Sequence, residues 1–404
     1  MSNPTSTEQR KNALLLIVAL GGISASLAAA FGALGLALVS MVQRDTEPAL
    51  GALWWAAGLL VVGLCGVPLA YWSGRGLFGL PAPAPARPSR RWAWIALLFP
   101  AAIGLGYLAF AQKVAPQILA PTAQILAAGI PVALIALLAR RLAPPVTARR
   151  AWAQFLLGVW VTPAVALALE VMTLIPLSLF VAVGLMLTPQ GLGLLRVLTE
   201  SPTPTLEQIA PSDLVLGQPW LVVVLLLFAA LLVPLVEEAL KTISVWPFLR
   251  KTITPGEAFL GGVLCGAGYA LFEALFLPQP GSEWAITMVS RVGTTLVHAF
   301  GAGITSLGLV NAVARQRPWR VLPPYLGAVA LHGLWNATVI GMGVGTLVLP
   351  EIADGSVRQW VEPLVNTIGP GVLLGLSLTA LVGIVGVARR LRKGGEAREP
   401  VAAS

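Results

Sequence analysis

The sequence predicts an all-α, polytopic transmembrane helix bundle, and three observations support this fold class. Hydrophobic residues make up 57% of the 404 residues and charged residues only 11%, whereas a soluble domain carries about 25% charged residues. Apolar runs longer than about 18 residues recur along the chain, and each could cross a ~30 Å hydrocarbon core as a helix. The basic residues are unevenly divided among the segments that connect these runs. We therefore expect a multi-pass protein of a prokaryotic cell membrane.

About ten runs qualify as spans. They cover residues 13–42, 49–72, 92–111, 118–139, 151–187, 220–249, 257–277, 286–314, 323–349 and 367–388. The run 151–187 is overlong for one straight crossing, and Pro163 and Pro176 would kink or divide it. The first run is too long for a signal peptide, so we expect it to be retained. Residues 188–218 form the longest outside segment, which is either a lid over the membrane face or a connector.

The distribution of basic residues predicts the orientation of these spans. With the N-terminus in the cytoplasm, most of the 26 Lys and Arg residues fall in cytoplasmic segments, as the positive-inside rule requires. These segments are 1–12, 73–91, 140–150, 250–256, 315–322 and the tail after Arg389. Both termini are then cytoplasmic. The net charge of +9 reflects topology, and we expect the lipid bilayer rather than nucleic acid as the partner.

Polar residues are concentrated in four consecutive later spans. The sixth span contains the stretch Val-Pro-Leu-Val-Glu-Glu-Ala-Leu-Lys, residues 233–241. The seventh contains Glu273, and the eighth and ninth contain His298 and His332, the only two histidines of the chain. An ionised group at the bilayer centre costs about 2.5–3.5 kcal/mol, so such groups need a partner, a water-filled cavity or a task. We expect these four helices to turn their polar groups toward one another.

Helical geometry predicts which groups meet. His332 and Asn336 are four residues apart and share a helix face, as do Glu237 and Lys241. At ~1.5 Å of rise per residue from the cytoplasmic ends, Glu238 and His332 lie at one depth, about 13–18 Å in. Glu273 and His298 lie at a second depth, about 25–27 Å in. The sequence therefore predicts two matched pairs within one polar cavity.

Carboxylate and imidazole groups inside a membrane suit hydrolysis of a peptide bond. The reaction needs a water deprotonated near neutral pH, by a carboxylate base or by a metal that acidifies the water. Histidine and glutamate ligands form catalytic zinc sites that keep one position open. The zinc motif H-E-x-x-H is absent from the chain.

These residues, taken in order, resemble the motifs of a known family. Residues 237–241 match E-E-x-x-K, residues 269–273 match F-x-x-x-E with Tyr in place of Phe, and His298 and residues 332–336 match a lone His followed by H-x-x-x-N. The pattern is similar to the PrsW intramembrane proteases, relatives of the CAAX-prenyl and bacteriocin-processing proteases, over roughly residues 151–345. One departure is Ala274, where family members commonly have Asn after the Glu.

The resemblance implies a helical intramembrane metalloprotease that cuts membrane-anchored proteins or peptides. Its implied catalytic residues are Glu237, Glu238, Glu273, His298, His332 and Asn336. Glu238, Glu273, His298 and His332 would hold the metal, expected to be Zn²⁺. One of the adjacent glutamates would act as base or ligand while the other pairs with Lys241, and His332 with Asn336 would complete the ligand set or stabilise the oxyanion.

Three regions follow from this interpretation. Residues 1–150 form a four-span scaffold, residues 151–350 form the catalytic helix bundle, and residues 351–404 form the last span and a basic cytoplasmic tail. Glu170 in the fifth span is either a site residue or a carboxylate hydrogen-bonded to a neighbouring helix. Arg291 is expected to anchor the outer interface.

Two other functions use similar residues. A proton-coupled secondary transporter also places carboxylates and histidines at mid-membrane, but transporters usually show two similar halves, and here the polar groups crowd the second half. A non-catalytic membrane protein of the same fold has no need of the complete motif set. Intramembrane proteolysis therefore remains the preferred interpretation.

Overall fold

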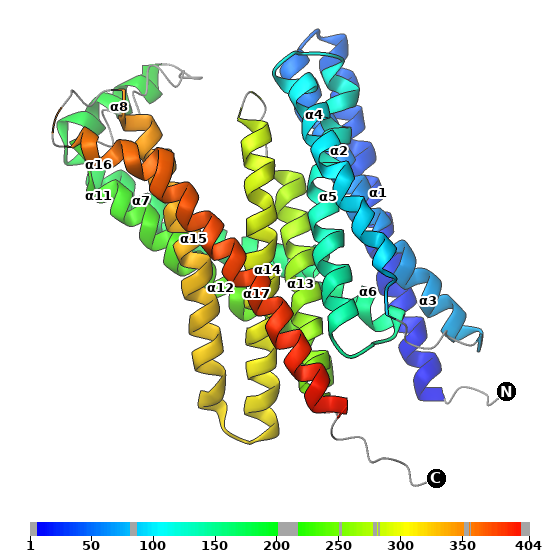
Figure 1. Ribbon diagram of the computed structural model, residues 1–404. Helices are drawn as coiled ribbons and strands as arrows, with labels where there is room; N and C mark the ends of the chain where they lie inside the picture. Colours follow the sequence, from blue (N-terminus) through cyan, green and yellow to red (C-terminus); the bar gives the residue numbers. More distant parts are fainter. Residues whose placement is uncertain are drawn as a thin grey trace, which may run out of the picture. The chain divides into compact units, whose positions relative to one another are not determined.

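A computed structural model gives the structure of the protein, and it describes residues 6–80, 87–200, 217–249, 253–277, 281, 283–350, 355 and 357–396. These residues form helices and short connections, with no strand among them. Ten helical stretches in the described chain are long and apolar enough to cross a membrane, and each overlaps one of the predicted spans. The predicted fold class is therefore confirmed (Figure 1).

The described chain forms two compact units. The first comprises Met1–Pro163, Lys241–Ala328 and Thr379–Ser404, and the second comprises Ala164–Leu240 and Val329–Leu378. The predicted division into three regions at residues 150 and 350 stays a prediction.

The first unit contains most of the N-terminal helices and the seventh and eighth spans. Its helices are α1 (Ser6–Val42), α2 (Thr46–Leu64), α3 (Val67–Leu77), η1 (Arg90–Leu97), α4 (Leu98–Phe110), α5 (Pro116–Leu142), α6 (Ala148–Leu156), η2 (Leu157–Val161), η4 (Lys241–Ser244), η5 (Trp246–Phe248), α13 (Pro255–Phe276), α14 (Trp284–Ala314) and η6 (Pro318–Val321).

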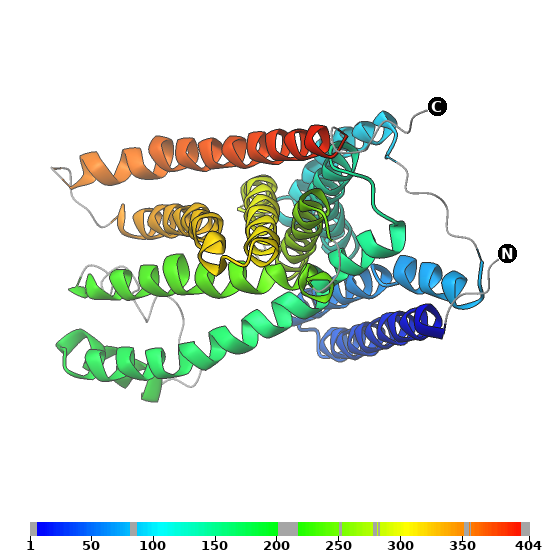
Figure 2. The ribbon, with the colours of Figure 1, turned by 90° about the horizontal axis from the view of Figure 1, so that it is seen from below.

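Helix α13 is the centre of the first unit. It lies against α14, α5, α6 and η2, and Figures 1 and 2 both show it side by side with α14. Its most apolar segment is 83% buried, whereas that of α1 is 11% buried. Large side chains of α1 such as Leu14 and Phe31 are exposed, as expected for residues that face lipid.

The second unit is built from the fifth, sixth and ninth spans and part of the tenth. Its helices are the main part of α7 (Thr162–Met186), α8 (Pro189–Glu200), α11 (Trp220–Leu226), η3 (Leu227–Leu232), α12 (Val233–Leu240), most of α15 (Leu322–Val348), α16 (Arg358–Pro363), η7 (Leu364–Ile368) and the start of α17 (Gly369–Glu396). Helix α8 corrects part of the sequence interpretation, because residues 189–200 of the segment expected to be a loop are helical. Residues 201–216 of that segment lie outside the described residues.

Prolines widen three of the helices by a π-turn. The π segments η2, η3 and η7 each end two residues before a proline, namely Pro163, Pro234 and Pro370. In each, the residue directly before the proline donates its N–H to the carbonyl five residues back. Proline has no N–H and its ring crowds the carbonyl four residues back, so the chain takes one wider turn. The run 151–187 is therefore one helical crossing with a π-turn, and Pro176 lies inside α7.

Candidate active site

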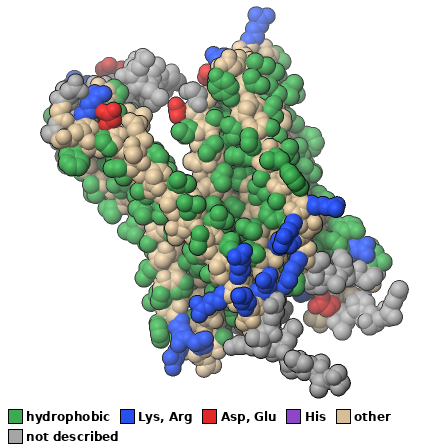
Figure 3. Space-filling view, in the orientation of Figure 1, with side chains coloured by type: hydrophobic (Ala, Val, Ile, Leu, Met, Phe, Trp, Pro, Cys, Tyr) green, Lys and Arg blue, Asp and Glu red, His purple; other side chains and the backbone are tan. Residues whose placement is uncertain are grey.

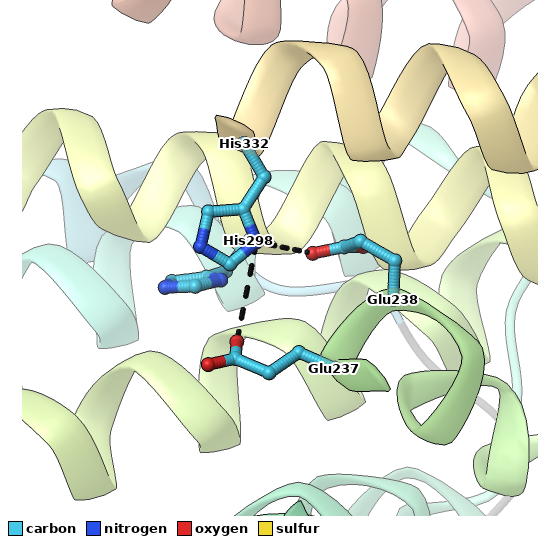
Figure 4. Close-up of side chains that lie close together, drawn as sticks. All are labelled: Glu237, Glu238, His298 and His332. Atoms are coloured by element: carbon cyan, nitrogen blue, oxygen red, sulfur yellow. Dashed lines mark hydrogen bonds and ion pairs between the residues drawn. The ribbon is translucent and has the colours of Figure 1, made fainter. Parts of the chain in front are cut away.

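The second unit contains a buried cluster of two carboxylates and an imidazole. His332 Nδ1 lies 3.0 Å from Glu238 Oε1 and 4.0 Å from Glu237 Oε2. The two glutamates of α12 point toward the ring from two sides (Figure 4). No side chain of the three exposes more than 4% of its surface. The predicted pairing of Glu238 with His332 is confirmed.

Proline and glycine bring α12 and α15 together at this cluster. A Cβ on Gly333, next to His332, would lie 2.2 Å from the carbonyl oxygen of Ala230 in η3. Only glycine permits so close an approach of a helix to a neighbouring backbone. The π-turn that precedes Pro234 shifts the register of α12 relative to η3, which sets the direction of Glu237 and Glu238.

Asn336 links the proline-widened turn to His332. Its amide nitrogen Nδ2 lies 2.8 Å from the Ala229 carbonyl oxygen and 3.3 Å from His332 Nε2. The residue five positions after Ala229 is Pro234, which has no N–H to donate, so the Ala229 carbonyl takes its donor from a neighbouring helix. The sequence predicted that Asn336 helps to bind the metal or to stabilise the oxyanion. In the structure its side chain contacts the Ala229 carbonyl and the His332 ring.

These contacts determine which ring nitrogen of His332 carries the proton. A carbonyl oxygen only accepts hydrogen bonds, so the amide nitrogen, not the amide oxygen, must face Ala229. The second N–H of the same amide is then directed at His332 Nε2, which accepts it. The ring proton therefore lies on Nδ1, from which it is donated to Glu238.

The first unit contains a second polar cluster, on η4, α13 and α14. Lys241 Nζ donates to His298 Nδ1 at 2.7 Å, so His298 Nε2 carries the proton and donates it to Glu273 Oε2 at 2.8 Å. Arg291 Nη2 donates to the same Glu273 oxygen at 2.9 Å. The predicted pairing of Glu273 with His298 is thereby confirmed, whereas the expectation that Arg291 anchors the outer interface is wrong, because its guanidinium contacts Glu273.

Tyr269 completes this second cluster. The Lys241 ammonium lies 4.5 Å from the centre of the Tyr269 ring, and the ring meets His298 edge-on with 5.3 Å between centroids. Lys241 is fully buried, and a cation over an aromatic face is favourable where water is excluded. Tyr269 lies four residues before Glu273, which puts both side chains on one helix face.

Glycine also positions His298. A Cβ on Gly266 of α13 would lie 2.2 Å from the His298 carbonyl oxygen, so the two helix backbones touch at this level.

Next to Glu273, the Ala274 carbonyl accepts a hydrogen bond from Gln124, whose own side-chain oxygen accepts from Trp284. Arg291 and His298 supply the polar contacts of Glu273.

The chemistry of the Glu237, Glu238 and His332 cluster fits a divalent metal ion. Each of the three offers one ligand atom, and these atoms lie within 4.8 Å of one another. Imidazole and carboxylate are ligands of catalytic zinc. Among the described residues, Glu170 is not part of this group. The buried Glu and His side chains could therefore bind a metal.

A comparison with known protein families identifies the family of the chain. Residues 147–353 match the PrsW-protease family, described as PrsW family intramembrane metalloprotease, and this segment contains all the residues of both clusters. None of the curated proteins matches the chain, and none of the solved structures does. The chain, a multi-pass integral membrane protein, belongs to the PrsW family of intramembrane metalloproteases.

Proposed function

We propose that the protein hydrolyses peptide bonds of membrane-anchored proteins or peptides at the cluster of Glu237, Glu238 and His332. The observation that carries the proposal is the hydrogen bond between Glu238 and His332, two fully buried groups on apolar spans. Purified full-length protein in detergent is expected to cleave a membrane-tethered reporter. Failure to cleave any such reporter, under conditions where the protein stays folded, would count against it.

The sixth span contributes to both clusters. Glu238 lies two residues before the end of α12, and Lys241 begins η4. Lys241 in turn contacts His298.

Each side chain has a role in the proposed reaction. Without a metal, a carboxylate of Glu237 or Glu238 accepts a proton from the attacking water, and His332 Nδ1–H holds Glu238 in place. Lys241 offsets the negative charge of the glutamates, and Glu273 with Arg291 fixes the ring of His298. Low water content in the cavity strengthens each of these interactions.

We propose Zn²⁺ as the metal; Glu237, Glu238 and His332 would hold it once His332 Nδ1 has lost its proton, which leaves a fourth position for water. When bound, it would lower the pKa of a coordinated water toward neutrality. Glu273 and His298 are not part of this set because they already contact each other, and Arg291 and Lys241 bind their remaining polar atoms.

Metal content tests the zinc assignment independently of catalytic activity. We expect about one zinc per chain by elemental analysis of the purified wild type, and its loss in His332→Ala, since structural and catalytic zinc need their full ligand sets. Glu170→Gln, which alters a carboxylate outside the cluster, should keep the metal. Full activity of protein shown to be metal-free would overturn the zinc assignment and leave a carboxylate base as the water activator.

Asn336 is proposed as a positioning residue. Asn336→Asp preserves the size of the side chain but removes both N–H donors, so an acceptor would face the Ala229 carbonyl and His332 Nε2. We expect kcat to fall about 10- to 100-fold, as for other partners that orient a catalytic histidine, with a displaced pH profile because the ring proton moves. Thr338→Ser, on the same helix and exposed, serves as the control. Unchanged kcat and pH profile in Asn336→Asp would show that the ring needs no such orientation.

A further inference from the structure

Five arginines surround one cavity at the end of the first unit. The cavity has a volume of about 210 Å³, and its lining consists of Arg87, Arg90, Arg141, Leu142, Arg389 and Arg392. No acidic side chain is among these lining residues. Figure 3 shows basic side chains gathered on this face around the last turns of α17. Nothing in the proposed proteolytic reaction uses them.

The lining arginines come from three segments that are remote in sequence. Arg87 lies three residues before η1 and Arg90 begins it, Arg141 lies at the end of α5, and the other two lie on the last turns of α17. Arg141 Nη1 donates to the Pro88 carbonyl at 2.6 Å, which ties the first two segments together. The sequence analysis assigned all three segments to one side of the membrane, so the fold brings together charges that share a compartment.

Five like charges around one small cavity repel one another unless an anion lies between them. Guanidinium groups are planar forks that donate two parallel hydrogen bonds to a phosphate, which makes arginine the preferred residue for binding phosphate. The cavity therefore has the chemistry of a phosphate site.

The surroundings of the cavity favour a phosphate carried by a lipid. Trp94 and Leu97 of η1 and Val382 of α17 are large apolar side chains that are more than 60% exposed. All three lie on predicted spans, beside the segments that carry the arginines. Tryptophan is enriched where a membrane meets water, and basic pockets at the ends of spans bind anionic head groups. Acyl chains could thus run along these helices while the head group enters the cavity.

We propose that this arginine pocket binds the head group of an anionic phospholipid of the cytoplasmic leaflet. The full-length protein, purified in a non-ionic detergent, would be titrated with phosphatidylglycerol or with phosphatidylcholine and analysed by native mass spectrometry. We expect one phosphatidylglycerol to be retained per chain at concentrations where phosphatidylcholine is not. In the double variant Arg389→Gln, Arg392→Gln, binding should weaken about thirtyfold, as expected for two lost arginines near an anionic head group.

A matched variant distinguishes binding of the lipid in the pocket from general electrostatic attraction of the lipid to this end of α17. Arg390→Gln with Lys393→Gln removes the same charge from the same turns of α17 but leaves the lining intact. We expect this variant to bind phosphatidylglycerol like the wild type. An equal loss in both double variants, or equal retention of the two lipids by the wild type, would overturn the proposal. Inorganic pyrophosphate that displaces the lipid at equal concentration would overturn it too, because the ligand would then be a soluble phosphate.

Discussion

Replacing Glu238 by Gln is expected to abolish cleavage of a membrane-tethered reporter, with a loss of about 10²- to 10⁴-fold in kcat, the range of general acid–base catalysis. The amide is isosteric, and its oxygen still accepts the proton of His332 Nδ1, so the helices should stay together. The amide cannot take a proton from water or hold a divalent cation as a carboxylate does. The reaction is therefore lost while the fold is kept. Reporter cleavage by gel, together with thermal unfolding in the same detergent, measures both properties.

Glu170→Gln is the matched control for Glu238→Gln. Glu170 is a half-buried carboxylate of an apolar span in the same unit, but it lies outside the Glu237, Glu238 and His332 cluster. We expect this variant to cleave the reporter at the wild-type rate. Full activity of Glu238→Gln would remove the proposed catalytic role. If neither variant affected cleavage but Glu238→Gln stopped proton movement across vesicles, a transport function would replace hydrolysis.

Adding a single methyl group at Gly333 is expected to reduce activity about 100-fold without touching any catalytic group. The Cβ of Gly333→Ala would meet the Ala230 carbonyl oxygen at 2.2 Å, far inside van der Waals contact. A helix backbone cannot shift at a single residue, so α15 must move away from η3 by about an ångström, and His332 moves with it. A displacement of about 1 Å at a catalytic group costs on the order of 10² in rate. Steady-state kinetics should show the loss mainly in kcat.

Gly341→Ala supplies the comparison on the same helix. No atom lies within 4 Å of the Cβ position of Gly341, so the substitution adds helix propensity without a clash. We expect wild-type kinetics and a slightly higher unfolding temperature. Equal kinetics for both alanine variants would mean that the close approach at Gly333 does not position His332.

The composition and spacing of the residues were sufficient to predict most of the architecture. Ten apolar runs predicted ten spans, because hydrocarbon thickness sets helix length independently of the tertiary fold. The same regularity of rise predicted that Glu238 meets His332 and that Glu273 meets His298, and both contacts are present. Helix length and helix periodicity are local properties, so a single sequence reveals them.

The remaining features depend on how helices deviate from ideal geometry and pack. The π-turn before Pro234 and the 3₁₀ turns after Leu240 change the direction of the sixth span, and they do so through backbone hydrogen bonds that a hydropathy pattern does not contain. Arg291 illustrates the same limit. The sequence predicted an anchor at the outer interface, whereas the contact of Arg291 with Glu273 depends on the crossing of α13 and α14.

The proposed function rests on the contact between Glu238 and His332, which is tested most directly by a chemical link between these two positions. Glu238→Cys and His332→Cys would be combined in a chain whose native Cys65 and Cys265 are replaced by Ala, and mercuric ion, which joins two thiolates, would be added before alkylation. We predict that one mercury per chain protects both cysteines, whereas Glu238→Cys combined with Gly341→Cys stays open to the alkylating reagent. Two independently reactive cysteines in the first pair would contradict the account.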